Sequence, residues 1–426
     1  MLLVAIIFFV LLFLNMPVAF AIGIASLSFF IIEPNLPVEI VTQRMVAGTQ
    51  SFPLLAVPFF ILAGNLMNSS GITERLIRFS NALTGHLIGS LAHVSIVLST
   101  IMGGVSGSAN ADAAMQSRIL GHKMIARGYS GGYSAAVIAI SSLITATIPP
   151  SIGLILYGYV GQVSIGKLFL AGIIPGILMM LVLMIVSYLV AKKRGYDQDI
   201  ITKRATFKEV LIAFKESIWA LLFPVILVVG IRFGIFTASE AGAFAVFYAL
   251  VIGFFVYKEL NWKNLIQSIE QSVTDNASIL LIIATSSILG FLITYDRLPQ
   301  NAADFLIGIT SNGTLLLLII LLFLVVAGMF IESTVLVLLL TPIFLPIVTQ
   351  VGVDPVHFGI LMMTIITFGG MTPPVGVTMY TTTSIMNVPI EEYIKEAIPF
   401  ILGVLVLVLF LVFVPGIVTF IPDLFM

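Results

Sequence analysis

Apolar runs of about 20 residues recur from Leu2 to Phe420, and they constrain the fold more than any other feature of the chain. A helix rises about 1.5 Å per residue, so each run can cross the roughly 30 Å hydrocarbon core of a bilayer. Charged residues make up 9% of the sequence, whereas soluble domains average about 25%. We therefore predict an all-α polytopic membrane protein, because helices satisfy the backbone in lipid.

Two absences from the sequence exclude classes of function. The chain has no cysteine, which excludes disulfides, thiolate metal sites and cysteine nucleophiles. No segment matches the Gly-x-x-x-x-Gly-Lys-Ser phosphate loop, so the sequence gives no sign of ATP hydrolysis. We expect contact with membrane lipid, and we expect neither an enzymatic cofactor nor a nucleic-acid partner.

The basic residues predict the membrane topology. We expect spans near residues 2–32, 53–68, 129–163, 168–190, 217–236, 239–257, 276–294, 356–386 and 398–420. In this threading all Lys and Arg residues lie on one side except Arg44, Lys167, Arg232 and Arg297. Because such an excess marks cytoplasmic loops, we predict a multi-pass membrane protein with a cytoplasmic N-terminus. The first run lacks a preceding basic residue and a clear cleavage site, so we expect one retained helix.

Two apolar stretches, residues 88–117 and 313–349, do not fit this threading as crossings. The charged residues on both flanks of each stretch must lie on the same side of the membrane. We therefore predict two re-entrant helical hairpins, the first entering from the cytoplasm and the second from outside. Irregular backbone at membrane depth persists where it is buried in protein or lines a wet cavity.

An internal repeat appears at a constant offset of 224 residues. Four landmarks recur at this offset: Pro149-Pro150 as Pro373-Pro374, Ile174-Pro175 as Ile398-Pro399, Gly128 as Gly352, and Gly104 as Gly328. An odd span between the halves predicts an inverted-topology repeat. The expected units are residues 1–190 (hairpin 88–117, broken helix 129–163), a basic cytoplasmic linker with an extra helix at 191–238, and residues 239–426 (hairpin 313–349, broken helix 356–386).

The hairpin centres and the Pro-Pro breaks hold the polar residues suited to binding ions. A Pro-Pro pair removes two backbone donors and frees carbonyl oxygens in the middle of a span. Such carbonyls suit sodium, and half-helix N-termini suit a carboxylate. The candidate sodium ligands are Gly103, Ser106, Ser108, Asn110, Thr147, Pro149, Gly328, Ser333, Thr334, Gly370 and Thr372. Close helix packing is the competing interpretation of any one such Gly/Ser cluster.

Two acidic residues, Asp112 and Glu332, lie beside the hairpin centres. An ionised carboxylate in hydrocarbon costs several kcal/mol, so we expect each to have a partner or a cavity. They are candidates for coupling to substrate, and a satisfied structural role is the alternative. The hairpin centres and breaks contain no Lys or Arg. We therefore expect an organic anion there to depend on sodium, and sodium on the anion.

An enzymatic alternative comes from Gly104-Val105-Ser106-Gly107, which matches the Gly-x-Ser-Gly of rhomboid intramembrane proteases. That chemistry needs a helix-borne histidine facing the serine. We expect His122 and His357 in loops at the membrane borders, and the repeat has no explanation under this hypothesis. An intramembrane serine protease is therefore the weaker reading, and a channel is a further alternative.

At several motifs the whole chain resembles the large membrane subunit of tripartite ATP-independent periplasmic (TRAP) transporters. The motifs are Asn-Met-Pro-Val-Ala-Phe at 15–20, Pro-Leu-Leu-Ala-Val-Pro-Phe-Phe-Ile-Leu-Ala-Gly at 53–64, the 106–112 hairpin and Thr-Pro-Pro-Val-Gly at 372–376. The resemblance implies a protein of the bacterial inner membrane that imports a carboxylate-bearing solute, coupled to sodium, by an elevator motion. It also implies two partners, a separate four-helix small membrane subunit and a soluble periplasmic binding protein.

The resemblance narrows the solute to organic anions such as sialic acids and C4-dicarboxylates, with sialic acid slightly favoured. A sodium-carboxylate symporter that needs no binding protein is the alternative. In an elevator the hairpins and broken helices would move against the remaining spans. Residues 70–86 and 297–311 mix polar and apolar side chains and would form amphipathic arms at the membrane interface.

Overall fold

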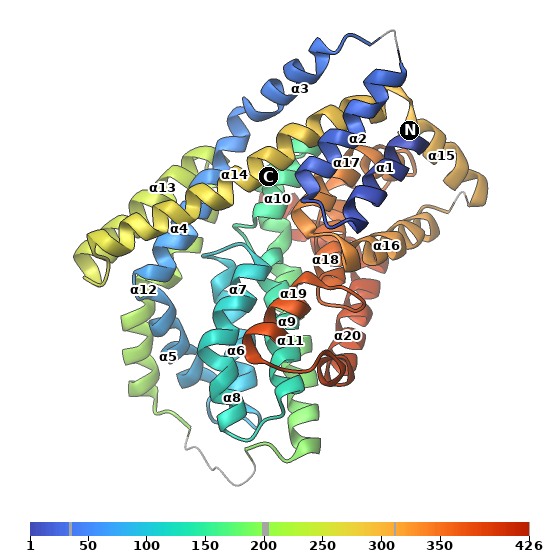
Figure 1. The fold of residues 1–426 in the computed structure, drawn as a ribbon. Helices are drawn as coiled ribbons and strands as arrows, with labels where there is room; N and C mark the ends of the chain where they lie inside the picture. Colours follow the sequence, from blue (N-terminus) through green and yellow to red (C-terminus); the bar gives the residue numbers. More distant parts are fainter. Residues whose placement is uncertain (34–35, 198–203, 311, 426) are drawn as a thin grey trace.

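The computed structural model describes residues 1–33, 36–197, 204–310 and 312–425. Part of the predicted linker, residues 198–203 with Lys203, and residue 311 at the end of the second predicted arm lie outside these ranges. The described residues form helices and connecting loops without strands (Figure 1). Within these ranges eight helices are long and apolar enough to cross a membrane, or nine if the bent pair α9 and α10 is one span. The protein is therefore a multi-pass membrane protein.

The helices of the first half carry the first hairpin and the first Pro-Pro break. They are α1 (Leu2–Phe13), α2 (Val18–Ile32), α3 (Glu39–Thr49), η1 (Phe52–Leu55), α4 (Ala56–Ser69), α5 (Ile72–Thr84), α6 (Ser90–Gly103), α7 (Ala109–Gln116), η2 (Ser117–Gly121), α8 (His122–Ala126), α9 (Gly131–Thr147), α10 (Ile152–Gly161) and α11 (Ile165–Arg194).

The remaining helices carry the second hairpin and the second break. They are α12 (Phe207–Arg232), α13 (Ala238–Val251), η3 (Ile252–Val256), α14 (Trp262–Tyr295), α15 (Leu298–Ile309), α16 (Gly313–Phe330), α17 (Ser333–Gln350), α18 (Pro355–Gly369), α19 (Val377–Met386), α20 (Ile390–Phe413) and α21 (Gly416–Phe425). The segments η2 and η3 are π-helical.

The prediction of one helix over residues 2–32 is wrong. The chain forms two short helices, α1 and α2, which pack against each other. Asn15 adopts a left-handed conformation with φ 62°, and Pro17 cannot donate to a continuing helix. These two residues end α1 and redirect the chain into α2.

The predicted side of the N-terminus conflicts with the rest of the threading. The Met1 amine lies 3.3 Å from the Asp296 carboxylate, at the C-terminal end of α14. The topology predicted from the basic residues puts this end of α14 outside the cell and the N-terminus in the cytoplasm. Figure 1 shows the N-terminus beside α15, at the end of the molecule opposite α8. A cytoplasmic N-terminus and a cytoplasmic α8 therefore cannot both hold.

The order of elements recurs at the 224-residue offset. The pair α6 and α7 corresponds to α16 and α17, the pair α9 and α10 to α18 and α19, and α11 to α20. Gly128 and Gly352 both have positive φ, at 91° and 81°. Pro175 and Pro399 both lie inside long helices. The first hairpin extends beyond the predicted end at residue 117, because η2 and α8 continue its second arm.

Both Pro-Pro pairs interrupt helices. Helix α9 ends at Thr147 and α10 begins at Ile152, and the two axes differ by 44°. In the second half α18 ends at Gly369 and α19 begins at Val377. Both Pro-Pro peptide bonds are cis. The predicted arms correspond to α5 and α15, the helices that precede the two hairpins.

The helices pack in two groups. In one group α4 packs on α13 and α14, and α14 packs on α2 and α3. In the other group α9 packs on α6 and α20, α16 packs on α18, and α10 packs on α17. Elements of the two sequence halves thus interleave in the second group (Figure 1). The arm α5 contacts both groups, since it packs on α4 and on α6.

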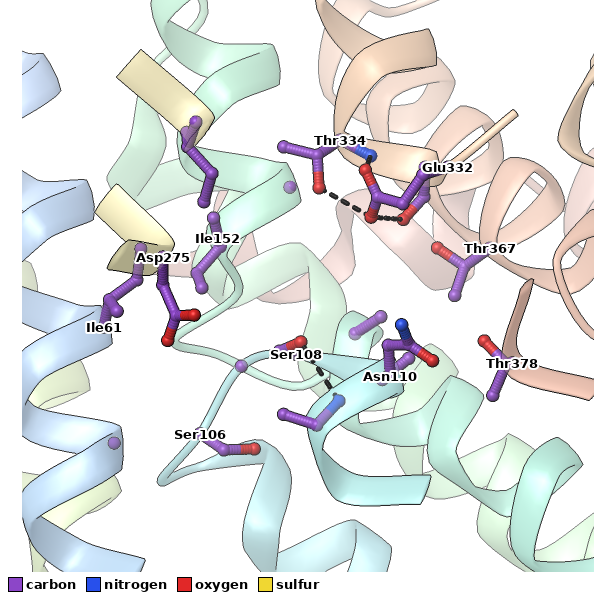
Figure 2. A pocket seen from close by; sticks show the side chains of 18 of the residues that line it. Ile61, Ser106, Ser108, Asn110, Ile152, Asp275, Glu332, Thr334, Thr367 and Thr378 are labelled. Atoms are coloured by element: carbon purple, nitrogen blue, oxygen red, sulfur yellow. Dashed lines mark hydrogen bonds between the residues drawn. The ribbon is translucent and has the colours of Figure 1, made fainter. Parts of the chain in front are cut away.

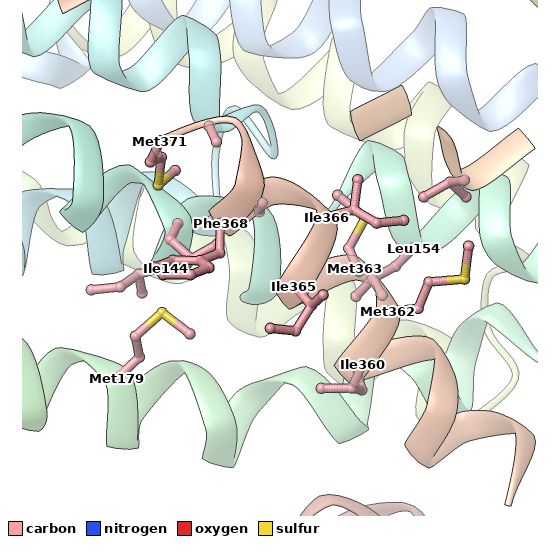
Figure 3. Close-up of a cluster of buried hydrophobic side chains, with 14 of the residues drawn as sticks. Ile144, Leu154, Met179, Ile360, Met362, Met363, Ile365, Ile366, Phe368 and Met371 are labelled. Carbon is pink, nitrogen blue, oxygen red and sulfur yellow. The ribbon is translucent and has the colours of Figure 1, made fainter. Parts of the chain in front are cut away.

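A buried apolar cluster fixes the broken helices against α11. Ile144 of α9, Phe368 of α18 and Met179 of α11 are all at most 1% exposed (Figure 3). Gly172 of α11 allows this approach, because a Cβ there would lie 2.2 Å from the Thr147 carbonyl oxygen. Small residues permit such close packing in membranes, where the lipid is as apolar as the side chains. The break of the first half is therefore held in one place.

The first residues after α11 are also anchored. The Asp197 carboxylate, 3% exposed, accepts hydrogen bonds from Arg127 Nε at 2.9 Å and from the Ser90 amide at 2.9 Å. It also accepts from the Tyr129 hydroxyl. Burial, and then the bond to Asp197, raise the pKa of Tyr129, so this phenol remains a donor. The base of the first hairpin and the start of α9 are thereby tied to the end of α11.

Candidate functional site

A cavity of about 480 Å³ lies where the two hairpin tips meet the two broken helices. Its lining comes from the loop before α7, the start of α17, the beginning of α10, and the α18–α19 break. Helices α4 and α14 close the remaining side. Figure 2 shows Glu332 and Thr334 on one side of the cavity and Ser108 and Asn110 on the other. A volume of this size suits a small organic molecule.

The first hairpin tip presents the N-terminus of α7 to the cavity. Ser108 is the N-cap residue, and its hydroxyl accepts a hydrogen bond from the Ala111 amide at 3.4 Å. Ala109, Asn110 and Ala111 of the first turn line the cavity. First-turn amides have no partner within the helix and carry partial positive charge. This end of α7 can therefore bind an anion.

The second hairpin tip is closed by its own carboxylate. Glu332 Oε2 accepts from the Thr334 amide at 2.8 Å and from the Val335 amide at 3.4 Å. Its other oxygen accepts from the Thr334 hydroxyl at 2.8 Å and from the Ser333 hydroxyl at 3.1 Å. The N-terminal amides of α17 are thus already paired with a negative charge.

Hydrogen bonds join each hairpin tip to the break of its own half. The Ile152 amide donates to the Gly107 carbonyl at 3.4 Å, and the Gly376 amide donates to the Met329 carbonyl at 2.8 Å. Gly107 has φ +61°, and a Cβ there would lie 2.2 Å from the Pro150 carbonyl oxygen. The first tip can approach the Pro-Pro pair this closely because residue 107 is glycine.

A wall of polar residues on α4 and α14 was not predicted. Asn65 donates to Ser272 at 2.9 Å and to Asp275 at 3.3 Å, and Gln271 donates to Asp275 at 2.8 Å. Asn65, Asp275 and Ser278 line the main cavity. Asn65 and Gln271 also line a second cavity of about 440 Å³ toward the N-terminal end of α14. We name the residues Ser268, Gln271, Ser272, Asp275 and Ser278 the α14 polar stripe.

About half of the predicted site residues line the main cavity. They are Ser106, Ser108, Asn110, Ser333, Thr334, Gly370 and Glu332. The predicted residues outside the lining are Gly103, Thr147, Pro149, Gly328, Thr372 and Asp112. Thr367 and Thr378 line the cavity but were not among the predicted ligands. Their only signal in the sequence is a hydroxyl close to the Gly369-Gly370 pair.

The predicted residues outside the cavity have packing or backbone partners. A Cβ on Gly103 would lie 2.9 Å from the Ile148 side chain, and one on Gly328 would lie 2.4 Å from the Ile366 carbonyl oxygen. Close packing therefore accounts for both glycines. The Thr147 and Thr372 hydroxyls donate to backbone carbonyls within their own turns, at 3.0 and 2.8 Å.

Asp112 lies in a separate buried cluster behind the first tip. Its carboxylate accepts from Ser99 at 2.8 Å, from Thr145 at 2.9 Å and from Gln116 at 3.0 Å. Ser141 bonds to Ser99 at 3.2 Å. We name Ser99, Asp112, Gln116, Ser141 and Thr145 the polar island. All five side chains are at most 1% exposed, so the partner expected for Asp112 is a set of neutral donors.

The geometry does not pair Ser106 with a histidine. Its hydroxyl donates to the Met102 carbonyl at 3.4 Å. His357 lies inside α18 rather than in a loop, and its Nε2 is 2.9 Å from the Leu411 carbonyl oxygen. His122 begins α8. Among the described residues, no hydrogen bond therefore forms the Ser-His pair that a protease of this kind needs.

The charge of the cavity is negative. Its described lining contains two carboxylates, those of Asp275 and Glu332, and no Lys, Arg or His. Two buried polar atoms in the lining, Asn110 Oδ1 and Thr367 Oγ1, have no hydrogen-bond partner among the described residues. Buried polar groups are rarely left unpaired, so these atoms are available to a bound molecule.

Sequence comparisons with known proteins match the chain to the large membrane component of TRAP transporters. Residues 5–417 match the family model "Tripartite ATP-independent periplasmic transporter, DctM component". The chain is 38% identical over 416 residues to the sialic acid TRAP transporter large permease protein SiaM of Vibrio cholerae, covering 98% of this chain and 97% of that one. It is 30% identical to the C4-dicarboxylate TRAP transporter large permease protein DctM of Rhodobacter capsulatus, covering 96% of each.

The fold is similar to that of a solved transporter structure. The YdaH transporter of Alcanivorax borkumensis aligns with a TM-score of 0.60 at 14% sequence identity, covering 89% of this chain and 88% of that one. At this identity the similarity concerns the fold alone.

Proposed function

Because the chain belongs to the DctM family of TRAP transporters, we propose that it is the subunit that carries a carboxylate-bearing solute across the bacterial inner membrane. The observation that carries the proposal is a single cavity lined by both hairpin tips and both breaks. Helix N-termini, hydroxyls and amides in such a cavity suit a polar anion. Binding sites formed where interrupted helices of two repeats meet are typical of secondary transporters.

Sodium supplies the positive charge in this proposal. The described lining of the cavity holds two carboxylates and no basic side chain, so an anionic solute raises the negative charge further. Sodium ions would bind carbonyls and hydroxyls near Ser106, Ser108 and Asn110 of the first tip. In the second half they would bind near Ser333, Thr334 and Gly370. Solute and sodium then raise each other's affinity by the same factor, typically about 5- to 150-fold.

The solute is an organic anion of the sialic acid or C4-dicarboxylate type, as the names of the relatives suggest. A soluble periplasmic binding protein delivers it, and a small four-helix membrane subunit completes the complex. Both partners are expected from the family. The open alternative is a sodium-carboxylate symporter that works without the binding protein.

The transport step is an elevator motion. The hairpins and broken helices form one packing group, and α2, α3, α4, α13 and α14 form the other. The arms α5 and α15 precede the hairpins along the chain and connect the two groups. We propose that the first group slides along α4 and α14 and carries the cavity with it.

The test is uptake of labelled N-acetylneuraminate or succinate into proteoliposomes that contain the chain and the small subunit. We expect accumulation that requires both an inward sodium gradient and the binding protein. Uptake that follows the solute gradient without sodium would indicate a channel and contradict the proposal. Sodium-driven uptake that is equal without binding protein would establish the alternative symporter.

A further inference from the structure

The two hairpin tips are equivalent positions of the repeat that carry different caps. Ser108 caps α7, and Glu332 caps α17 at the same offset of 224 residues. Both side chains line the same cavity, on opposite sides (Figure 2). The repeat therefore builds two helix N-termini, each suited to a carboxylate, and the sequence fills one of them with a carboxylate of its own.

The filled position is fully hydrogen-bonded. Each carboxylate oxygen of Glu332 accepts two hydrogen bonds. One oxygen accepts from the amides of Thr334 and Val335, and the other accepts from the hydroxyls of Ser333 and Thr334. A carboxylate of the solute would have to displace this side chain to reach the same amides. Displacing it would leave Glu332 without those partners in a cavity whose described lining has no basic residue.

The other position is open. The Ser108 cap is neutral, and the nearest carboxylate on α7 is that of Asp112, which is bonded to Ser99, Thr145 and Gln116. Thr367, 3% exposed, directs into the cavity near Asn110 a hydroxyl that has no hydrogen-bond partner among the described residues (Figure 2). This hydroxyl is a second group, independent of the helix end, that is available to a bound anion.

Asn110 adds a requirement for a donor. Asn110 lines the cavity, and its Oδ1 is a buried atom without a partner among the described residues. A carbonyl oxygen can only accept. A hydroxylated acid offers O–H donors to this atom. Succinate at neutral pH offers carboxylate acceptors only, and it would leave Asn110 Oδ1 unpaired at a cost.

We propose that Glu332 acts as a built-in anion that occupies the second carboxylate position, so that the cavity selects hydroxylated monocarboxylates over dicarboxylates. The proposal rests on the proposed function, since it concerns the solute of the same cavity. Like charges brought together in a desolvated site strongly disfavour the wrong ligand. Glu332 is thus a specificity-determining residue, and it favours the sialic acid type of solute over the C4-dicarboxylate type.

The experiment is equilibrium binding to the full chain purified with the small subunit, without the binding protein, so that the readout reports the preference of the cavity itself. The probes are N-acetylneuraminate, with one carboxylate and several hydroxyls, and succinate, with two carboxylates and no hydroxyl. Both are titrated in sodium and in choline buffers. The variants are Glu332→Ser, which copies the first tip, Glu332→Gln, which removes the charge, and Glu332→Asp, which keeps it.

For the wild type we expect N-acetylneuraminate to bind at least about tenfold more tightly than succinate in sodium. Glu332→Ser should reduce this ratio by about tenfold, Glu332→Gln by less, and Glu332→Asp little. Gln retains an acceptor for the Thr334 amide, so this variant keeps the cap if the serine variant does not fold.

Two outcomes separate the inference from the proposed function. If succinate binds the wild type as tightly as N-acetylneuraminate, or if the ratio is unchanged in both neutral variants, the specificity role of Glu332 is wrong while the transporter proposal stands. If neither acid binds in a sodium-dependent way to any variant, the proposed function itself fails, and the inference fails with it.

Discussion

The interiors of the two hairpins differ although their helices correspond one to one. The polar island of Ser99, Asp112, Gln116, Ser141 and Thr145 joins the first hairpin to α9, which contributes Ser141 and Thr145. At the offset of 224 residues the second half has Leu336, Leu340, Ile365, Gly369 and Phe323, of which the last is 52% exposed. Hydrogen bonds therefore hold the first hairpin to α9, whereas apolar packing holds the second hairpin to α18. The same backbone plan is thus stabilised by two different kinds of interaction.

The largest expected effect tests whether the two halves are inverted. Ala126 and Gln350 are equivalent, exposed positions at the ends of the two hairpins. Because the native chain has no cysteine, Ala126→Cys and Gln350→Cys each provide a single reactive thiol. We expect an impermeant thiol reagent to label them from opposite faces of the membrane. Labelling of both from one face would contradict the inverted repeat.

The next effect concerns the polar island. Asp112→Leu copies the residue of the second half, but it removes the carboxylate that accepts from Ser99, Thr145 and Gln116 and leaves each donor one other acceptor within the cluster. We expect a loss of about 3 to 5 kcal/mol in stability, because several buried hydrogen bonds to one carboxylate are lost and an apolar side chain is placed among polar groups. Thermal unfolding in detergent measures it. Asp112→Asn keeps one acceptor and should lose less, and equal losses in the two variants would argue against these hydrogen bonds as the cause.

A smaller effect is expected on sodium-driven uptake when the two Pro-Pro breaks are replaced in turn. Replacing Pro149-Pro150 or Pro373-Pro374 with Ala-Ala restores backbone donors and recaptures carbonyls that the breaks leave free. We expect each double variant to fold and to lose about tenfold in sodium-driven uptake. Sodium titrations in proteoliposomes report the change. Unaltered sodium dependence in both variants would mean that the ions bind elsewhere.

The smallest expected effect is on apparent sodium affinity, and it distinguishes the two predicted ligand hydroxyls of Ser108 and Thr372. Ser108 lines the cavity, whereas the Thr372 hydroxyl donates to the Gly369 carbonyl at 2.8 Å. We expect Ser108→Ala to weaken apparent sodium affinity by about two- to fivefold, comparable to the loss of one hydrogen-bonding ligand. Thr372→Ala should change it little. A larger effect at Thr372 would place sodium at the second break rather than at the first tip.

The sequence alone was enough to predict the elements that rest on local signals. Pro149-Pro150 and Pro373-Pro374 predict the two breaks because proline removes backbone donors wherever it occurs in a helix. The single offset then predicts the corresponding hairpins. The break between α1 and α2 was missed although Asn15 and Pro17 mark it, because an apolar run of that length was read as one crossing.

The part of the site that was missed depends on contacts between distant segments. Asn65 and Asp275 are 210 positions apart and meet only because α4 packs on α14. The sequence did show the carboxylate of Asp275 at the edge of the apolar run 276–294, and an acidic residue at such a position is a signal of function in membrane proteins. The role of Glu332 as a cap likewise depends on the turn before α17, and its spacing alone left a coupling role and a structural role open.

The α14 polar stripe has an electrical consequence. It runs from Ser268 to Ser278 along the cavity wall, and beyond it the lining on α14 becomes apolar at Ile279 and Ile282. We expect water to reach the polar end of this wall and the apolar end to exclude it. Most of a membrane voltage would then fall across the apolar end, where each elementary charge is worth about 2.3 kcal/mol per 100 mV. In the proposed function, such a wall would keep a sodium gradient from discharging through the empty transporter.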